Sequence, residues 1–220
     1  MIESGDLAVP AATVARLPHY LRALHALEAD GVRTTSSTEL ADASGVGSAQ
    51  LRKDLSFLGS FGTRGVGYDV ASLSVVISSA LGLGSTHRLA IIGLGNLGHA
   101  LANYSGYTAR GFEVVALLDV AAAVVGTRPS GSLAVEHLDD LEKILERESV
   151  TMVVLATPAH AAQAVAERVT ASGVREILSF SPVALQVPDD VVVRSVDVAG
   201  ELQILAFHAA ARAASRSAKG

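Results

Sequence analysis

A glycine-rich turn between two apolar strands constrains the fold of this 220-residue chain more than any other feature. The segment Gly93-Leu94-Gly95-Asn96-Leu97-Gly98 follows the apolar run 89–92 and precedes a second run, 114–118, which ends in Asp119. The order strand, glycine turn, helix, strand and acid is typical of a dinucleotide site. The acid lies roughly 20 residues past the glycines, a spacing that lets its carboxylate reach an adenosine ribose. We therefore predict a Rossmann domain.

Each glycine of this turn has a separate expected role. Gly93 permits the tight turn, Gly95 lets the backbone approach a pyrophosphate, and Gly98 lets the next helix pack closely on the sheet. The helix points its free N–H groups and positive dipole end at the phosphates. Asp119 would repel a 2′-phosphate and no arginine follows it, so we expect NADH or NAD+ and not their phosphorylated forms. The alternative is an ordinary glycine turn of an α/β fold.

Composition excludes several classes of protein. The chain has no cysteine, which removes disulfides, thiolate nucleophiles and iron–sulfur clusters. Half of the residues are hydrophobic, but charged residues interrupt every long apolar run, so no segment of ~20 residues would span a bilayer. The seven histidines lack metal-ligand spacing. We expect a cytoplasmic protein without a metal, and the net charge of −5 confines any DNA contact to a local patch.

The second half of the sequence alternates between β-branched runs and alanine-rich stretches. This alternation predicts a doubly wound parallel sheet with right-handed crossovers. Strands are expected at 88–93, 113–118, 132–136, 150–156, 175–180 and 191–196, and helices at 96–110, 138–148 and 159–172. The last stretch, 200–220, reads as one helix whose apolar residues need a surface to pack on, and a partner subunit is the natural candidate.

The first 80 residues have the pattern of a winged helix-turn-helix. Ser36 and Glu39 form a capping box that starts a helix, and a second helix begins after Ser48 with Leu51 and Leu55 facing the core. The glycine-rich segment 59–68 reads as a β-hairpin wing. The candidate DNA-binding residues are Ser48, Gln50, Arg52, Lys53, Ser56, Arg64 and Gly65.

The charge balance of this region keeps another interpretation open. Residues 1–75 hold six Lys or Arg and eight Asp or Glu, so the region could also be a small helical interaction domain. With the winged-helix interpretation, the chain divides into a DNA-binding domain at 1–80, a hinge at 81–86, a Rossmann domain at 87–199 and a C-terminal dimerisation helix at 200–220.

Several long segments resemble the Rex family of redox-sensing transcriptional repressors. The matching segments are Val9-Pro10-Ala11-Ala12-Thr13, Arg16-Leu17-Pro18 with Tyr20, Ala49-Gln50-Leu51-Arg52-Lys53-Asp54-Leu55-Ser56, 59–68, Gly95-Asn96-Leu97-Gly98 with Tyr104, Val196-Asp197 and Glu201-Leu202-Gln203. The resemblance covers almost the whole chain. It implies a homodimer that exchanges its C-terminal helices, binds palindromic operator DNA when free or bound to NAD+, and releases the DNA when NADH binds.

The resemblance also implies the parts of an allosteric switch. In the family, the arginine that corresponds to Arg16 pairs with the aspartate that corresponds to Asp197 in one state, and the tyrosine that corresponds to Tyr104 takes that aspartate in the other. The chain departs from the family pattern at Leu58, at Tyr107 and over 179–182, near the nicotinamide. The candidate cofactor-binding residues are Gly93, Leu94, Gly95, Asn96, Leu97, Gly98, Tyr104, Asp119, Thr157 and Pro158.

Two other functions remain as alternatives. A dehydrogenase would use a positioned acid such as His160, which follows an expected strand, but the chain leaves little room for a substrate domain. A CoA-binding module could share the fold, although Asp119 favours a ribose with free hydroxyls over the 3′-phosphorylated ribose of CoA.

Overall fold

The computed structural model describes residues 9–63, 66–129 and 131–217. These residues form two compact units, Met1–Ser85 and Thr86–Gly220. The division falls inside the expected hinge at 81–86. Leu81 and Leu83, however, pack against the core of the first unit, so the first part of that segment belongs to it.

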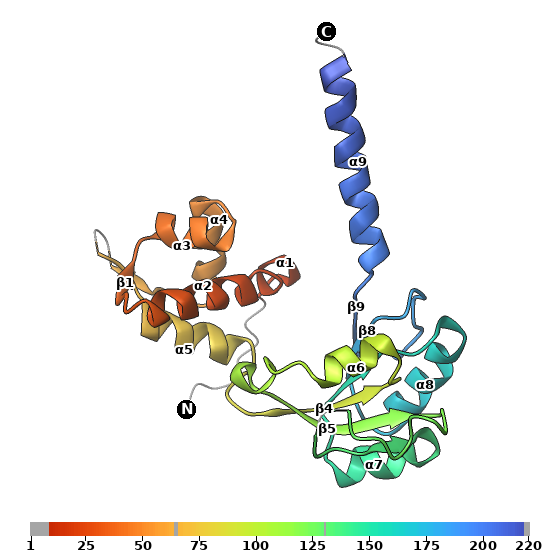
Figure 1. Ribbon diagram of the computed structural model, residues 1–220. Coiled ribbons are helices and arrows are strands. Elements are labelled where there is room, and N and C mark those ends of the chain that lie inside the picture. Colours follow the sequence, from red (N-terminus) through yellow and green to blue (C-terminus); the bar gives the residue numbers. More distant parts are fainter. Residues whose placement is uncertain (1–8, 64–65, 130, 218–220) are drawn as a thin grey trace. The chain divides into compact units, whose positions relative to one another are not determined.

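The described residues of the first unit form five helices and a small antiparallel sheet (Figure 1). Its strands have the order β1-β3-β2, and Tyr68 pairs with both Thr35 and Gly62. The elements are α1 (Ala11–Val14), α2 (Leu17–Ala29), β1 (Thr34–Thr35), α3 (Ser37–Ser44), α4 (Ser48–Ser56), β2 (Gly62–Thr63), β3 (Gly67–Asp69) and α5 (Val70–Ala80).

Local sequence signals account for the helix-turn-helix of this unit. The capping box is present: Ser36 Oγ accepts a hydrogen bond from Glu39 N at 3.2 Å, and Glu39 Oε2 accepts one from Ser36 N at 2.7 Å. Gly45 ends α3 in the left-handed conformation, with φ +71°, and α4 begins three residues later. Leu51 is fully buried and Leu55 nearly so, as the periodicity predicts.

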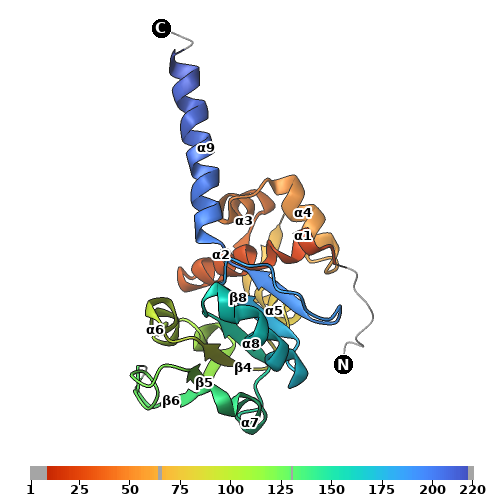
Figure 2. The same ribbon diagram turned by 90° about the vertical axis from the view of Figure 1, so that its right-hand side faces the viewer.

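The second unit contains a six-stranded parallel sheet with the order β6-β5-β4-β7-β8-β9, as the alternating pattern predicts. Figure 2 shows α7 and α8 beside this sheet. The elements are β4 (His87–Ile92), α6 (Asn96–Ala102), η1 (Thr108–Arg110), β5 (Phe112–Asp119), β6 (Val135–His137), η2 (Leu138–Asp140), α7 (Leu141–Arg147), β7 (Met152–Leu155), α8 (Ala159–Ala171), β8 (Glu176–Ser179), β9 (Val192–Ser195) and α9 (Val198–Ser217).

The pleat of the central strand β4 separates two cores. Ala90 and Ile92 face a core that contains residues of α7 and α8, whereas Ile91 faces a core that contains Leu94 and Ala102 from the turn and helix after β4. Successive side chains of a strand point to opposite faces, so helices cover both faces of the sheet. The sheet is therefore doubly wound.

The helix expected over 96–110 ends at Ala102, and this is the largest difference from the sequence-based prediction. Gly106 lies against the ring of Tyr104, where a Cβ atom would overlap the ring, and Gly111 has φ +82°. A turn and the short 3-10 segment η1 therefore follow Ala102, although the alanine-rich pattern predicts a continuous helix there. The strand expected from position 132 begins only at Val135, and the helix expected from 138 begins as the 3-10 turn η2.

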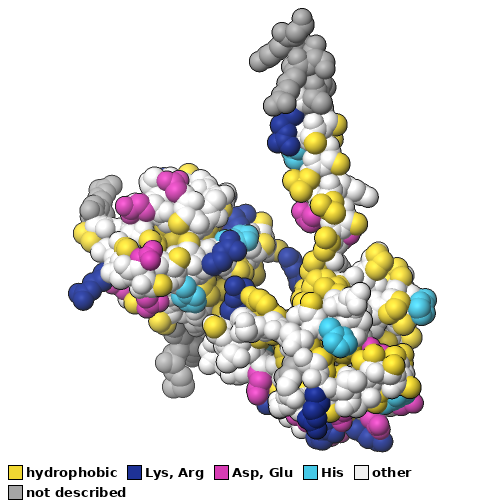
Figure 3. All heavy atoms as spheres, viewed as in Figure 1, with side chains coloured by type: hydrophobic (Ala, Val, Ile, Leu, Met, Phe, Trp, Pro, Cys, Tyr) yellow, Lys and Arg dark blue, Asp and Glu magenta, His cyan; other side chains and the backbone are white. Residues whose placement is uncertain are grey.

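Helix α9 extends away from the body of the second unit (Figures 1 and 2). Its described apolar side chains are exposed, including Leu202, Leu205 and Phe207, which is 70% exposed. Hydrophobic side chains are visible along the helix in Figure 3. The helix thus has no packing surface among the described residues of its own chain. Among these residues, no helix combines the length and hydropathy needed to cross a bilayer.

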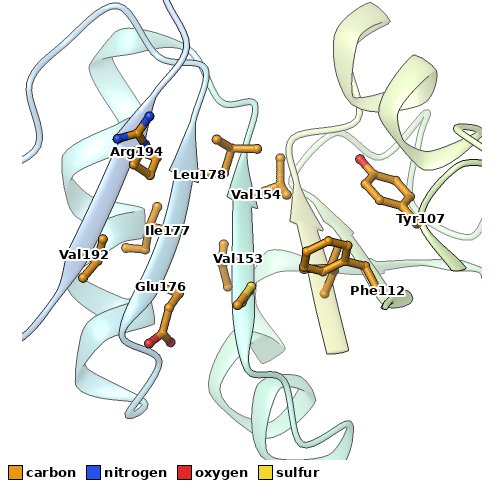
Figure 4. A pocket seen from close by; sticks show the side chains of 11 residues that line it. Tyr107, Phe112, Val153, Val154, Glu176, Ile177, Leu178, Val192 and Arg194 are labelled. Carbon is orange, nitrogen blue, oxygen red and sulfur yellow. The ribbon is translucent and has the colours of Figure 1, made fainter. Parts of the chain in front are cut away.

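One face of the sheet is also partly open. A cavity of about 340 Å³ lies over β4, β7, β8 and β9 and is lined mainly by apolar side chains. In Figure 4, Tyr107 and Phe112 stand at one side of this cavity and Val192 and Arg194 at the other. The cavity and α9 are two apolar surfaces that the described residues leave uncovered.

Candidate functional site

The glycine turn joins β4 to α6, and its three glycines meet different surroundings. A Cβ atom at Gly93, whose φ is +94°, would lie 2.7 Å from the carbonyl oxygen of Ala156. A Cβ atom at Gly98 would overlap the carbonyl oxygen of Gly93. Gly95 has open space within 4 Å. Packing thus explains Gly93 and Gly98, whereas Gly95 keeps a space clear that the described residues do not fill.

Asp119 lies beside this turn at the end of β5. Its Oδ2 accepts a hydrogen bond from Leu94 N at 2.5 Å, and its Oδ1 accepts one from Ala121 N at 2.8 Å. The fold therefore brings the acid to the glycines, although it follows them by more than 20 positions. A carboxylate here can also accept hydrogen bonds from ribose hydroxyls.

Two hydroxyl groups at the carboxyl ends of neighbouring strands have no hydrogen-bond partner in the described part of the chain. Thr157 follows β7 and Ser181 follows β8, and these strands pair in parallel through Leu155 and Ser179. Thr157 Oγ1 and Ser181 Oγ are buried without a hydrogen bond among the described residues. A buried polar group without a partner is costly, so these two hydroxyls keep an unused hydrogen-bonding capacity at this edge of the sheet. Thr157 was a candidate from the sequence, whereas Ser181 was not.

The remaining candidates of the second unit lie at its surface. Leu97 and Tyr104 are 44% and 45% exposed, and the Tyr104 ring stands edge-on to Tyr107 with ring centroids 5.0 Å apart. Asp197 Oδ1 accepts a hydrogen bond from Gly200 N at 3.0 Å in the first turn of α9. Among the hydrogen bonds of the described residues, Tyr104 and Asp197 are not paired. Asn96 is the first residue of α6, and Pro158 precedes α8.

Helix α4 carries the candidate DNA-binding residues of the first unit. Gln50, Arg52, Lys53 and Ser56 are exposed, and Ser48 is half-buried at the start of the helix. Arg52 Nη1 donates a hydrogen bond to Ser37 Oγ on α3 at 3.4 Å. The two remaining candidates, Arg64 and Gly65, lie outside the described residues.

A buried carboxylate on α4 forms the most connected polar group of the first unit. Asp54 is fully buried. Arg16 donates to it twice, from Nε to Oδ2 at 2.6 Å and from Nη2 to Oδ1 at 2.7 Å. Tyr20 donates from its hydroxyl to Oδ2 at 2.6 Å, and Thr13 and Gln50 donate to Oδ1 at 2.9 Å each.

The electrostatics of this cluster follow from its burial. Burial alone would raise the pKa of Asp54, but the hydrogen bonds from Arg16, Tyr20, Gln50 and Thr13 outweigh it and hold the pKa well below its usual range. Burial, with the hydrogen bond to Asp54, raises the pKa of Tyr20 to about 12. Asp54 is therefore ionised and paired at neutral pH.

Sequence reasoning did not identify Asp54 as a functional candidate. The signal was available, because Asp54 lies three positions after Leu51 and next to Leu55 and so falls on the buried face of α4. The structure also gives Arg16 a partner, Asp54, that the family resemblance did not indicate. The pairing of Arg16 with Asp197 stays a prediction from the family resemblance.

The described residues offer little support for a metal or for an acid at His160. They contain no cluster of three or more His, Asp or Glu side chains that could hold a metal ion. His160 is exposed in the first turn of α8. An exposed helix position does not by itself give a histidine a catalytic role.

A helix-turn-helix with a wing and a doubly wound domain with a dinucleotide-type turn define a class, the transcription regulators with a nucleotide-binding domain. Comparisons with known proteins indicate the same two parts. A family model described as "Putative DNA-binding protein N-terminus" matches residues 8–56, and one described as "CoA binding domain" matches residues 85–183. The chain belongs to the Rex family of redox-sensing transcriptional repressors.

Relatives of this chain match it over both units. The redox-sensing transcriptional repressor Rex of Streptomyces avermitilis is 55% identical over 210 residues, which cover 96% of this chain and 83% of the relative. Rex of Syntrophomonas wolfei is 44% identical, with 92% of this chain and 96% of the relative covered.

A solved structure is similar over the same extent. The crystal structure of RSP in complex with NAD+ and operator DNA has a TM-score of 0.88 and 33% identity, and covers 96% of this chain and 97% of RSP. The crystal structure of RSP with NADH has a TM-score of 0.85 and 31% identity, with 95% and 98% covered.

Proposed function

We propose that this chain is a redox-sensing transcriptional repressor that binds operator DNA and leaves it when NADH binds. The observation that supports this most is the similarity over 96% of the chain to RSP, a repressor crystallised with operator DNA and NAD+ and also with NADH. Repression would then follow the cellular ratio of NADH to NAD+. The proposal places the protein in the cytoplasm and gives it no catalytic step.

The residues around the glycine turn fit a dinucleotide. The space at Gly95 would admit the pyrophosphate, with the adjoining N–H groups of α6 as donors, and Asp119 would accept the adenosine ribose hydroxyls. Thr157 Oγ1 has a free hydrogen-bonding capacity at the next strand end. When bound, the cofactor supplies a nicotinamide ring that differs between its two forms by a hydride and a positive charge. Leu94, Leu97, Pro158 and Tyr104 complete the proposed site.

The DNA-binding part of the proposal uses α4 as the recognition helix. Gln50 and Ser48 would face base edges in the major groove, and Arg52, Lys53 and Ser56 would face phosphates. Arg64 and Gly65, outside the described residues, are proposed for the minor groove. Among the charged residues within 1–75, Asp54 is buried and paired with Arg16, so this pair contributes no net charge to the surface that DNA meets.

We further propose a homodimer that exchanges its α9 helices. The exposed apolar side chains of α9 and the open cavity on the sheet are surfaces that a second copy would cover. A two-fold dimer would place two recognition helices on half-sites ~34 Å apart, which matches a palindromic operator. In this dimer, Asp197 would alternate between Arg16 and Tyr104 as the cofactor changes.

The decisive experiment is a titration of fluorescent operator DNA. The probe is a palindromic duplex selected by this protein from a randomised pool, and its anisotropy is followed at fixed salt, because phosphate contacts make affinity salt-dependent. Saturating NADH is expected to weaken binding roughly 5- to 150-fold relative to NAD+, the range of a coupling free energy of ~1–3 kcal/mol. Equal binding with the two nucleotides would refute the sensor.

Two additions to this titration separate the remaining functions. CoA is included because a family model of that description matches residues 85–183; an effect of CoA that NADH does not produce would favour a CoA-binding module. Consumption of NADH with a small carbonyl compound, abolished by His160→Ala, would instead indicate a dehydrogenase. Neither result is expected, because Asp119 disfavours a phosphorylated ribose and His160 is exposed.

A further inference from the structure

Asp54 joins three helical segments of the first unit through one carboxylate. It lies on the recognition helix α4, whereas Thr13 belongs to α1, Arg16 to the junction before α2, and Tyr20 to α2. Five hydrogen bonds converge on its two oxygens, at distances of 2.6–2.9 Å. A carboxylate has about four lone-pair sites, so both oxygens are fully used. Four of these five bonds tie α4 to α1, to α2 and to Arg16 between them, and so fix the place of α4.

Arg16 is the only one of these donors with a positive charge, and its side chain is partly accessible from outside the unit. Its side chain is 27% exposed, whereas Asp54 is completely buried and Thr13 and Tyr20 nearly so. An acceptor outside the unit can thus reach the guanidinium without entering the core. If such an acceptor draws Arg16 away, Asp54 keeps only neutral donors, and a buried carboxylate without its cation is strongly destabilising.

Gln50 connects the buried Asp54 to the exposed face of α4 through a hydrogen bond. Gln50 is one turn before Asp54, and its Nε2 donates to Asp54 Oδ1 at 2.9 Å. An ionised carboxylate accepts only, so this bond sets the orientation of the amide and turns Oε1 away from Asp54. A glutamine reads adenine through both of its amide atoms, and the orientation therefore matters for base recognition.

We propose that Asp54 is a positioning residue for operator recognition, which ties Arg16 to the recognition helix and fixes the amide of Gln50. The inference rests on the proposed function and extends it with the route by which a change at Arg16 reaches the DNA. Asp54 itself is buried and touches no DNA. Asp54 acts by fixing the position of α4 and by determining which base pair Gln50 recognises.

The test compares Asp54→Asn with a matched control in the full chain. Asp42→Asn removes one negative charge from an exposed position on α3, so it reports the effect of net charge alone. Each protein is titrated with the selected palindromic duplex, with single-base-pair variants of it, and with an unrelated duplex of equal length. Thermal unfolding and NADH binding without DNA verify that both units remain folded.

Asp54→Asn is expected to weaken binding to the selected duplex at least tenfold and to lose discrimination at one base pair of each half-site. Gln50→Ala should lose discrimination at the same base pair, and the double variant should be no worse than Asp54→Asn, because coupled residues are non-additive. Asp42→Asn should keep the base preference of the wild type. Unrelated DNA should bind Asp54→Asn and Asp42→Asn alike, since both lose one negative charge.

Two results would overturn the proposal. One is an Asp54→Asn protein with unchanged operator affinity and base preference; the other is independent, additive effects of Asp54→Asn and Gln50→Ala. Should Asp54→Asn not fold, Arg16→Lys keeps the charge but loses the two-pronged geometry, and an unchanged base preference in that variant would also overturn it. The wild-type response to NADH is measured in parallel, so failure of the sensor is seen separately from failure of this inference.

Discussion

The substitution Gly95→Ala tests the proposed cofactor site, because it is expected to change the stability of the protein very little. Gly95 has φ −67° and ψ −169°, a conformation that alanine adopts, and a Cβ atom there would meet nothing within 4 Å. Alanine restricts the unfolded chain, which adds about 0.4–1 kcal/mol to the free energy of unfolding. Gly95 is also the N-cap of α6, where alanine is worse by a comparable amount, about 0.5 kcal/mol. The two effects offset each other, so stability is expected to change by less than about 1 kcal/mol.

The affinity for NADH should nevertheless fall at least tenfold, or about 1.4 kcal/mol, because the added methyl group takes the space proposed for the pyrophosphate. The assay is a titration of NADH fluorescence, with thermal unfolding in parallel. Gly84→Ala is the matched control, since Gly84 also has open space around it but lies outside the site. Gly98→Ala should behave in the opposite way and destabilise the fold by about 1–3 kcal/mol or more, because its Cβ would overlap the backbone of Gly93.

A Gly95→Ala protein that binds NADH as the wild type does would refute this reasoning. It would mean that no part of the cofactor approaches the backbone at this glycine. The same outcome would leave the fold intact and require the nucleotide to lie elsewhere on the sheet edge.

Three further predictions concern separate parts of the chain. The pKa of Tyr20 is raised to about 12 by burial and by Asp54, compared with about 10 in an unfolded chain. The resulting stabilisation is complete below pH 10 and is lost as pH rises through 12. Denaturant unfolding should show that Tyr20→Phe removes this part of the fall in unfolding free energy at high pH. Ser36→Ala should lower the free energy of unfolding by about 1 kcal/mol, because Glu39 N loses its partner, and a midpoint shift in urea measures this. Asp119→Asn should reduce the preference for NADH over NADPH in paired titrations, and an unchanged preference would count against its role at the ribose.

Much of the fold follows from local patterns in the sequence. The capping box at Ser36 and Glu39 needs only residues three apart, and it forms as the pattern indicates. The parallel sheet follows from β-branched runs separated by helical stretches, since strand and helix periods differ. The helix expected over 96–110 ends at Ala102. The alanine-rich pattern that suggested a longer helix includes Gly106, which lies against the ring of Tyr104. A contact of this kind is not visible in the periodicity.

The glycine turn and Asp119 illustrate what the sequence by itself determined. Tight turns, close backbone approach and an acid at a strand end are requirements of the backbone, so the residue types and their spacing reveal them. Only the tertiary structure decided which groups are paired and which are left without a partner. Arg16 and Asp54 are 38 positions apart, and Thr157 and Ser181 come from different strand ends. Burial and hydrogen bonding depend on the residues that folding brings together from distant positions, and one sequence does not record those neighbours.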